Sequence, residues 1–367
     1  MKNMKKTTVI LITLILINVY PIIVKTEVIA YNDLPSYFSW RNVSGTDYTT
    51  PIKNQAPAPT CEAYALVASL ETKMQYKLGK IYNPDLSEAH LYFYAGGTIR
   101  AGYVNLIDAA NYLIEHGVPD EGCFPDPHRP YDFPFESLPG WENRTVRVKE
   151  WGWVEHEPEA IKRALIEYGP LIICAYLWRD FYYYHGGIYH HKWGRIIGGH
   201  VMALVGYDDE QRCWIIKNSW GTEWGEDGWL RIAYDSLAIA EWYGEGTGVM
   251  YLGDVYGNLE PDVPKVQIEQ PEIYHTYVFG KEFPTIFRKM PFIQEGAPRI
   301  IGNLTVKVKA ENTDKVEFYL DGELKHVDEE EPYEWVLRSK PGAHTIEVFA
   351  YKKESVSKDV VDIFIFL

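Results

Sequence analysis

The sequence predicts an α+β protein in which a helical half and a strand-rich half are followed by an all-β domain. Three observations lead to this prediction. Apolar residues recur at spacings of three and four between about residues 61 and 116, which is the period of an amphipathic helix. Shorter apolar runs typical of strands follow between residues 146 and 176. Beyond residue 301 the pattern alternates with a period of two, as in the strands of a sandwich.

The size and composition are those of a globular protein. The chain has 367 residues, enough for two domains with sizeable cores. Hydrophobic residues make up 46% of it, which excludes wholesale disorder. The formal net charge of −15 argues against non-specific binding to nucleic acid or to an anionic membrane surface. We therefore expect a soluble protein without a nucleic-acid partner, and the sequence leaves its oligomeric state open.

The first 30 residues have the layout of a secretory signal peptide. Met1–Lys6 is short and basic, Val9–Val19 is almost wholly apolar, and Ala30 is a small residue suited to precede a cleavage site. An uncleaved membrane anchor is the alternative, but the apolar stretch is interrupted and short for a span of about 20 residues. We therefore expect residues 1–30 to be removed, and the mature protein to be secreted or extracellular, with association to the cell surface left open.

The stretch before the first helix predicts a stiff loop. Pro57 and Pro59 each fix their own φ and bias the preceding residue away from the helical conformation. Thr60 is placed to cap the helix through its hydroxyl. The helix then begins at Cys61, and Gly79 is expected just beyond its C-terminus.

The position of Cys61 suits a nucleophile. Free amides and the positive end of the helix dipole favour a thiolate over a thiol at a helix N-terminus. The alternative is a small buried residue that starts a core helix, which is the commoner state of a free cysteine. Cys61 alone does not decide between the two interpretations.

The elements that follow are predicted from caps, periodicity and helix breakers. We expect, in order, a short helix at 86–91, a helix at 104–116, a proline-rich connection at 119–144, a strand at 146–154, a helix at 157–168, a buried strand at 171–176 and an aromatic stretch at 181–191. His190 and His191 invite a metal interpretation, but adjacent strand residues point to opposite faces and no set of carboxylates or cysteines accompanies them. We predict surface or packing histidines, and no metal or other cofactor.

Three stretches carry a resemblance to a known family. They are Pro51–Gln55, Gly198–Asp208, which contains His200, and Trp214–Trp229, which contains the run Asn-Ser-Trp-Gly. Together with Cys61 they resemble the papain family of cysteine peptidases, whose order of Gln, Cys, His and Asn they reproduce. His200 follows Cys61 by about 140 residues, within the separation of about 130–150 typical of that family.

The resemblance implies a role for each member of a catalytic set. It makes Cys61 the nucleophile, His200 its proton carrier in a thiolate–imidazolium pair, and Asn218 the residue that orients the imidazole. Gln55 would donate its side-chain amide to the oxyanion, together with the backbone N–H of Cys61. Trp220 would shield the hydrogen bond between histidine and asparagine from water.

The resemblance also implies an extended polypeptide substrate in a cleft between the two halves. Gly97 would lie alongside the substrate backbone, where glycine permits a close approach, although an ordinary loop is the alternative. Gly198 and Val201 occupy positions near the main specificity pocket of the family, which favours an apolar substrate side chain. The implied reaction is hydrolysis through a thioester acyl-enzyme, by an endopeptidase or an exopeptidase.

Three departures from the family pattern bear on activity. Ala58 stands where the family has a disulfide cysteine, and the prolines around it can replace the lost stiffening. Glu62 stands where the family has an aromatic residue. A solvated carboxylate about 6 Å from the sulfur costs the thiolate about 0.7 kcal/mol, and burial would enlarge this penalty, although we expect the closer imidazolium to outweigh it. The family's long propeptide has no counterpart between the predicted signal and Asp33, so another restraint on activity is expected.

Three further cysteines accompany the nucleophile. At most one disulfide can form among Cys123, Cys174 and Cys213 if Cys61 is free. Cys174 and Cys213 lie in apolar strands, where they can be buried thiols. The sequence leaves the pairing open.

The pattern of the chain changes at about residue 261. Residues 261–300 are punctuated by prolines and are expected to form a linker and the first part of the C-terminal region. In the following part, 301–367, Val316–Leu320 runs into Asp321-Gly322, a strong hairpin signal. These strands resemble the immunoglobulin-like domains appended to secreted prokaryotic proteins. Such a domain is expected to position or tether the enzyme, for example through a cell-surface partner.

Taken together, the motifs favour an exported papain-like thiol peptidase whose catalytic domain covers residues 31–260. Two alternatives remain. A binding protein without catalytic activity could keep the fold, as Glu62 and the missing propeptide suggest, although the intact set of four residues opposes it. A thiol acyltransferase would use the same acyl-enzyme with an acceptor other than water.

Overall fold

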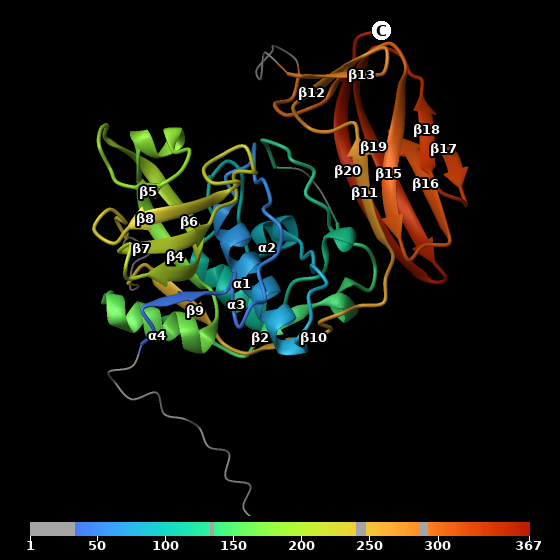
Figure 1. The fold of residues 1–367 in the computed structure, drawn as a ribbon. Helices are drawn as coiled ribbons and strands as arrows, with labels where there is room; N and C mark the ends of the chain where they lie inside the picture. The colour runs from blue at the N-terminus through green and yellow to red at the C-terminus, as the bar shows by residue number, and fades with distance from the viewer. Residues whose placement is uncertain (1–33, 133–135, 240–246, 286–292) are drawn as a thin grey trace, which may run out of the picture. The chain divides into compact units, whose positions relative to one another are not determined.

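The computed structural model describes residues 34–132, 136–239, 247–285 and 293–367. The predicted signal peptide, Ala30 included, lies outside these residues. Within them, no helix is both long enough and apolar enough to span a membrane. Figure 1 shows helices clustered in the first half of the described chain and strands alone in the last third.

The described part of the chain forms α-helices where the sequence predicts them: α1 (Cys61–Leu78), α2 (Glu88–Tyr94), α3 (Leu106–Glu115) and α4 (Pro158–Tyr168). Local signals account for their ends. Ser87 and Asn105 accept hydrogen bonds from backbone N–H groups of the first turns of α2 and α3. Gly79 follows α1 with a φ of 64°, the left-handed conformation expected of it.

The start of α1 differs from the prediction in one respect. The Thr60 hydroxyl makes no capping hydrogen bond and has no hydrogen-bond partner among the described residues. The residue has a φ of −111° and a ψ of 24°, which is not the extended conformation of a side-chain cap. Its carbonyl instead accepts the N–H groups of Ala63 and Tyr64. The predicted cap is therefore wrong, whereas the predicted first residue, Cys61, is confirmed.

One large sheet forms the strand-rich half. Its order is β3-β9-β4-β6-β7-β8-β5, and β1 pairs with β6 outside this path. The bounds are β1 (Tyr37–Ser39), β3 (Trp151–Trp153), β4 (Leu171–Trp178), β5 (Ile188–Tyr189), β6 (Ile196–Asp208), β7 (Cys213–Lys217), β8 (Trp229–Ala233) and β9 (Val249–Leu252). A separate pair joins β2 (Val146–Val148) to β10 (Val255–Gly257). The strand predicted at 146–154 is thus two short strands, and the one at 171–176 is part of β4.

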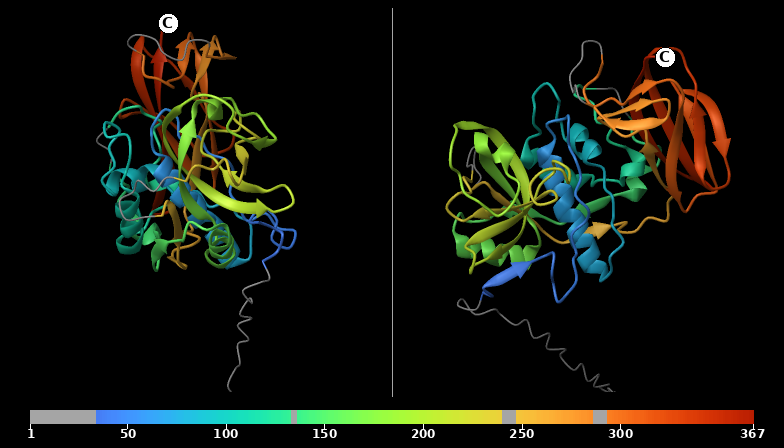
Figure 2. Two further views of the ribbon diagram at one scale, coloured as in Figure 1. Left: turned by 90° about the vertical axis from the view of Figure 1, so that its left-hand side faces the viewer. Right: turned by 45° about the horizontal axis from the view of Figure 1, so that its top comes forward.

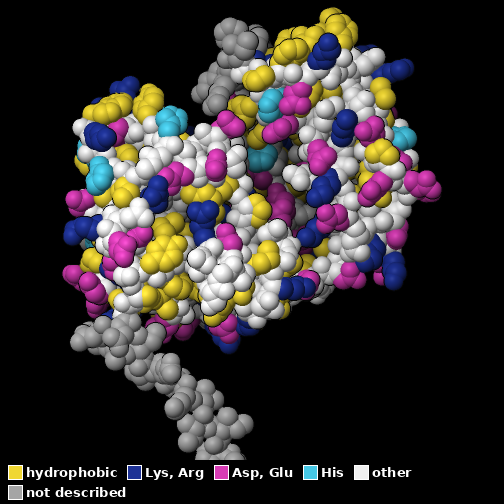
Figure 3. All heavy atoms as spheres, in the orientation of Figure 1, with side chains coloured by type: hydrophobic (Ala, Val, Ile, Leu, Met, Phe, Trp, Pro, Cys, Tyr) yellow, Lys and Arg dark blue, Asp and Glu magenta, His cyan; other side chains and the backbone are white. Residues whose placement is uncertain are grey.

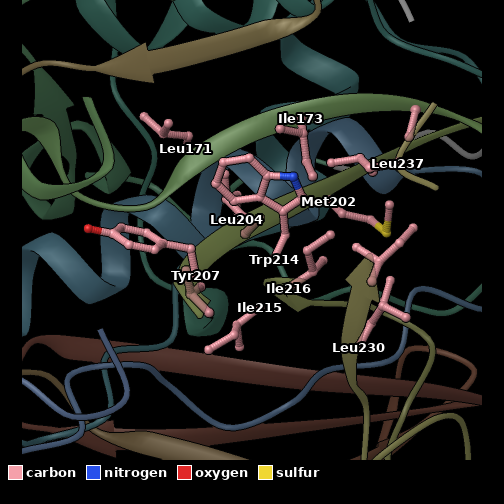
Figure 4. Packing of buried hydrophobic residues seen from close by; sticks show 14 of the residues in the cluster. Leu171, Ile173, Met202, Leu204, Tyr207, Trp214, Ile215, Ile216, Leu230 and Leu237 are labelled. Carbon is pink, nitrogen blue, oxygen red and sulfur yellow. The ribbon is translucent and has the colours of Figure 1, made fainter. Parts of the chain in front are cut away.

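Two hydrophobic clusters hold this region together. One packs strands β4, β6, β7 and β8 against each other and against α4, with the side chains of Figure 4, including Trp214 and Leu204, at its centre. The other packs α1, α2 and α3 against the other side of the sheet. Figure 1 and Figure 2 agree in placing the three helices beside the sheet. Helix α1 packs against β6, and the backbone N–H of Val201, in the middle of that strand, reaches the sulfur of Cys61 at the start of the helix.

The C-terminal region is all β and forms two sheets, in the orders β11-β15-β18 and β13-β12-β14-β20-β19-β16-β17. Its strands are β11 (Lys265–Gln270), β12 (His275–Val278), β13 (Lys281–Pro284), β14 (Arg299–Ile301), β15 (Leu304–Glu311), β16 (Lys315–Leu320), β17 (Glu323–Asp328), β18 (Tyr333–Leu337), β19 (Gly342–Lys352) and β20 (Ser355–Ile365). Apolar residues of both sheets form one core, as period-two alternation requires. Asp321 and Gly322 make the predicted hairpin turn between β16 and β17.

Residues 261–300 were expected to form a linker and the first part of the C-terminal region. Their described part contributes strands to both sheets. Strand β11 pairs with β15, and β14 pairs in parallel with the last strand, β20. Hydrogen bonds then join β20 to the long connection of the first domain. Arg129 binds Asp362 through two of its nitrogens, and Arg144 donates to the carbonyl of Val356 at 2.6 Å.

Charged side chains of both signs are interspersed over the face seen in Figure 3.

Candidate active site

The fold brings the predicted nucleophile and the predicted base to one place. Strand β6 carries His200 opposite Ala175 of β4. The sulfur of Cys61, at the start of α1, receives the backbone N–H of Val201, the residue next to this histidine. Residues about 140 positions apart in the sequence therefore meet where a helix N-terminus points at the middle of a strand.

The histidine is oriented by the asparagine that the sequence singled out. His200 Nε2 lies 2.8 Å from Oδ1 of Asn218, and both side chains are buried. An amide oxygen can only accept, so Nε2 carries the proton and Nδ1 presents a lone pair. The Asn218 oxygen also accepts the backbone N–H of Ser219 at 2.9 Å, which fixes the orientation of the amide.

Aromatic side chains cover this pair. The ring of Trp220 lies 4.8 Å from that of His200, centroid to centroid. Tyr182 stacks on the same indole at 5.2 Å, and Phe181 and Trp224 pack against its edges. The predicted shield over the histidine–asparagine hydrogen bond thus belongs to a larger aromatic cluster.

The loop before α1 is tied to the segment after β7. The backbone N–H of Gln55 donates to the carbonyl of Ser219, and that of Gly221 donates to Lys53. The Gln55 side-chain oxygen accepts the Ser219 hydroxyl at 2.6 Å, and its nitrogen donates to the carbonyl of Ala58 at 3.1 Å. Ser219 is therefore a site residue to which sequence reading gave no role, although it lies within the recognised Asn-Ser-Trp-Gly run.

The model of the papain family cysteine protease matches residues 34–243 of the chain. The chain belongs to the papain family of cysteine proteases. A second model, that of a bacterial Ig domain, matches residues 297–348. Both matches confirm the resemblances stated from the motifs, and the α+β fold class is confirmed with them.

The chain is similar to several papain-family proteins. It is 51% identical over 76 residues to "Cathepsin B-like CP3" of Giardia intestinalis, which is 20% of this chain and 25% of that protein. It is 29% identical over 215 residues to "Testin-2" of Mus musculus, covering 55% and 61% of the two chains. The matched part of this chain thus covers between a quarter and about three fifths of the length of these two relatives.

Among solved structures, xylellain, a cysteine protease from Xylella fastidiosa, shares the fold. The two superpose with a TM-score of 0.50 at 20% sequence identity, over 62% of this chain and 88% of that one. At this identity the likeness concerns the fold alone.

The papain-family site of this chain has an unusual neighbour of the nucleophile. Glu62 is only 3% exposed, so the burial that the sequence left open occurs. Its Oε2 lies 3.5 Å from the Cys61 sulfur, which donates to it. Within the described residues, the Cys61 sulfur donates its side-chain hydrogen bond to Glu62 and not to His200.

The electrostatics of the resting site differ from the expected ion pair. Burial, and then the Glu62 carboxylate, raise the pKa of Cys61 well above its usual value, although the Val201 N–H opposes them. Burial also lowers the pKa of His200 to about 4, against the opposing effect of its bond to Asn218. Both directions favour a neutral thiol and a neutral imidazole. They oppose the resting thiolate–imidazolium pair expected from the resemblance, which stays a prediction.

Behind the nucleophile lies a set of buried charges that sequence reading missed. Lys53 contacts Glu71 of α1 at 2.9 Å and Glu88 of α2 at 2.8 Å. Lys217, next to Asn218, donates to the Thr50 hydroxyl, which in turn donates to Glu71. The four charged residues, Lys53, Glu71, Glu88 and Lys217, line a cavity of about 20 Å³, room for about one water molecule. Charged residues at helical spacing look like a solvated face, so the sequence offered no clear signal.

The predicted substrate-binding residues lie in different environments. Gly198 is exposed, and a side chain added there would meet nothing within 4 Å. Gly97 is buried, and a Cβ added there would lie 2.6 Å from the carbonyl oxygen of Tyr92. Tight packing against Tyr92 therefore explains why this position is a glycine. Val201 is 1% exposed in the core, so it offers the site its backbone rather than its side chain. Of the three, Gly198 leaves open space for a ligand.

The other candidates take structural positions. All four cysteines are free thiols, and those besides Cys61 are buried. His191 stacks on Trp178 and lies 3.1 Å from Asp180, and His190 is exposed, as predicted for packing and surface histidines.

In the C-terminal region, His275 has Glu272 and Glu282 each 3.6 Å from a different ring nitrogen. Carboxylates on opposite nitrogens suit ion pairing better than one shared metal ion.

Proposed function

We propose that the protein is an exported cysteine peptidase that hydrolyses extended polypeptides. The observation that carries the proposal is the bond between His200 Nε2 and Asn218 Oδ1 at 2.8 Å, with the Cys61 sulfur against the backbone of Val201. This bond leaves a lone pair on His200 Nδ1, so the imidazole can act as the base that a sulfur nucleophile needs for acyl transfer.

In the proposed reaction, Nδ1 of His200 takes the proton of Cys61 as the sulfur attacks the substrate carbonyl. The oxyanion is stabilised by the Gln55 side-chain amide and the backbone N–H of Cys61. His200 then gives its proton to the leaving amine, and the acyl group remains on sulfur as a thioester. A water molecule, deprotonated by the same imidazole, releases the product acid.

The substrate is proposed to lie across the open backbone at Gly198. The exposed glycines at 198 and 199 continue directly into His200, so a peptide bonded to this edge would present its carbonyl to the sulfur. Gly97 is retained as a proposed backbone contact on the opposite side. Which side chains are accepted, and whether the enzyme cuts internally or at ends, is not specified by these contacts.

Export is proposed from the first 30 residues and from the C-terminal domain. The basic and apolar segments have the layout of a signal peptide. The match to a bacterial Ig domain is compatible with a location outside the cell or on its surface. We propose that this domain binds a surface partner.

The first test is labelling of the purified mature protein with a thiol-directed epoxide inhibitor, read by mass spectrometry between pH 4 and pH 8. Labelling confined to Cys61, persisting at acidic pH and lost in His200→Ala, would support the activated pair. Cys61→Ala reports background labelling of the other thiols. Labelling of Cys61 no faster than that of an ordinary thiol, at every pH, would overturn the proposal.

One observation favours a second candidate, a binding protein of the same fold. The buried carboxylate of Glu62 beside the nucleophile opposes thiolate formation. If Cys61 proves unreactive at every pH, peptides should still bind the cleft, and isothermal titration with unlabelled peptide libraries would reveal it.

A further inference from the structure

A carboxylate buried on helix α1 joins the two segments of the chain that carry Gln55 and Asn218. Glu71 is fully buried and lies on the same helix as Cys61, about 15 Å from it along the helix axis. At this distance Glu71 touches none of the reacting atoms. Its hydrogen bonds nevertheless lead to both site residues, along two separate paths.

The first path leads to the loop of Gln55. Oε1 of Glu71 accepts a hydrogen bond from Lys53 Nζ at 2.9 Å. The carbonyl of Lys53 accepts the backbone N–H of Gly221 at 3.1 Å. Gln55, further along the loop, donates its own N–H to the carbonyl of Ser219 at 2.9 Å. The side chain of Lys53 therefore ties to α1 the short segment whose backbone pairs with residues 219–221, and we call this connection the loop path.

The second path leads to Asn218. Lys217, the last residue of β7, donates to the Thr50 hydroxyl at 2.8 Å, and this hydroxyl donates to Oε2 of Glu71 at 2.5 Å. An ammonium group can only donate and a carboxylate can only accept, so the hydroxyl proton points to Glu71. Asn218 follows Lys217 directly in the chain, and both line the cavity that Glu71 lines. We call this connection the strand path.

We propose that Glu71 is a positioning residue of the catalytic site, which holds Asn218 through the strand path and Gln55 through the loop path. Both paths end at one side chain of α1. The amide that holds the base and the amide proposed to stabilise the oxyanion are therefore placed relative to the helix that begins at Cys61. The proposal rests on the proposed peptidase function.

Two reactions of Cys61 distinguish the two paths. Hydrolysis of a peptide forms an oxyanion and needs both amides. Alkylation by iodoacetamide forms no oxyanion, because the sulfur displaces iodide while His200 takes the thiol proton, and it therefore does not need Gln55. Both rates are measured on the full chain at pH 7, hydrolysis with a quenched fluorescent peptide and alkylation of Cys61 by mass spectrometry.

Thr50→Val and Glu71→Gln both break the strand path. Valine keeps the size of threonine without its hydroxyl, and glutamine has one accepting oxygen where the carboxylate uses both. In each variant we expect kcat and the rate of alkylation to fall together, by about tenfold, with little change in KM, because Asn218 holds the imidazole less firmly. The double variant should be no slower than Glu71→Gln, since both changes break the same path. Thr50→Ser keeps the hydroxyl and should stay near the wild type.

Lys53→Met breaks the loop path and leaves the strand path intact. We expect kcat to fall by about tenfold while the rate of alkylation stays within about twofold of that of the wild type, because only the oxyanion amide loosens. Glu71→Gln weakens this path less, since Lys53 keeps Asp85 and Glu88 as partners at 2.7 and 2.8 Å.

Ser69→Ala is the matched control for the loss of a buried hydrogen bond on the same helix. The Ser69 hydroxyl donates to the carbonyl of Pro170 at 2.6 Å, which lies on neither path. This variant should unfold at a lower temperature and keep both rates of the wild type. Thermal unfolding of each variant shows whether it is folded. If Glu71→Gln does not fold, the Thr50 and Lys53 variants decide.

The failure of this inference can be told from that of the proposed function. Wild-type rates in Thr50→Val and Glu71→Gln would overturn the positioning role, and so would an equal fall of both rates in Lys53→Met. In either case, hydrolysis and alkylation that are lost in His200→Ala leave the peptidase proposal in place. A wild type that hydrolyses no peptide, and whose Cys61 reacts no faster than in His200→Ala, would overturn both, since there is then no catalytic site to position.

Discussion

At the scale of single residues, the site depends on two amides that are each locked in one orientation. Asn218 Oδ1 accepts from His200 and from the backbone N–H of Ser219. Gln55 Oε1 accepts from the Ser219 hydroxyl, so its nitrogen must face the other way. One serine therefore orients both the residue that holds the base and the residue proposed to stabilise the oxyanion.

This arrangement gives a kinetic prediction. Gln55→Ala removes a donor that acts on the developing oxyanion, so kcat should fall by about 10²–10³ with little change in KM. Ser219→Ala leaves the amide in place and loosens it, so a smaller loss of kcat is expected. Steady-state kinetics on a quenched fluorescent peptide separate the two parameters. A loss confined to KM in Gln55→Ala would mean that the residue binds substrate instead.

The site residues that belong to a sequence motif could be predicted, whereas contacts that depend on the geometry of the folded chain could not. Cys61, His200, Asn218 and Gln55 are recognised by their order and neighbours, and the structure brings them together. The donation from Cys61 to Glu62 depends on burial and side-chain direction, which periodicity does not encode. The missing Thr60 cap has the same cause, since it depends on one pair of dihedral angles.

At the scale of elements, helix α2 carries a histidine that must stay neutral for the protein to be folded. His90 is fully buried, and neither of its ring nitrogens has a hydrogen-bond partner among the described residues. It stacks on Tyr94 at 4.2 Å and packs against Trp141. Burial lowers the pKa of His90 to about 3, so the unfolded chain binds a proton more readily than the folded one.

Because of His90, the folded protein should become less stable as the pH falls. The stability contributed by neutral His90 is fully present above pH 6.5, the ordinary value, and is lost as the pH falls toward 3. Between pH 7 and pH 4 the wild type should lose about 2–3 kcal/mol more of its free energy of unfolding than His90→Phe. Urea unfolding at both pH values measures this difference. Exposed His190→Phe is the control, and an equal acid loss in wild type and His90→Phe would contradict the prediction.

Element types were predictable from caps and periodicity, whereas the buried charges between elements were not. The helices begin and end near the expected residues because Ser87, Asn105 and Gly79 act locally. The contacts of Lys53 with Glu71 and Glu88 join a loop to two helices. Such contacts arise only in the folded chain, and in the sequence the same residues look like a solvent-facing set.

At the scale of the whole molecule, the C-terminal sandwich is bound to the first domain by ion pairs with little exposure. Arg129 and Asp362 contact through two hydrogen bonds, and their side chains are 15% and 11% exposed. Arg144 joins Asp120 of its own domain to Ser357 of β20. Period-two alternation predicted the sandwich itself. It did not predict strands β11 to β14, because prolines punctuate that part of the sequence.

The interface gives a stability prediction. Arg129→Ala leaves Asp362 without its main partner in a mostly dry site, so the free energy of unfolding should fall by about 3 kcal/mol. Lys149→Ala breaks a pair with Asp254 whose side chains are 62% and 50% exposed, and should cost at most about 1 kcal/mol. Urea unfolding, with limited proteolysis of residues 258–264 as a second readout, compares them. Equal small effects would show that the Arg129 pair contributes no more than a surface pair.

The free state of the four cysteines has a consequence for how the protein survives oxidation. Burial, the largest cause in each, raises the pKa of Cys213 to about 11 and of Cys123 to about 12, and raises that of Cys174 as well. Thiols kept protonated and out of reach are poor targets for peroxide. No covalent cross-link between cysteines is at risk when a reductant is added. Cys61 is only partly buried, whereas the other three thiols are buried. Oxidative damage should therefore concentrate on Cys61, and a mild reductant should reverse its first stage while the scaffold stays intact.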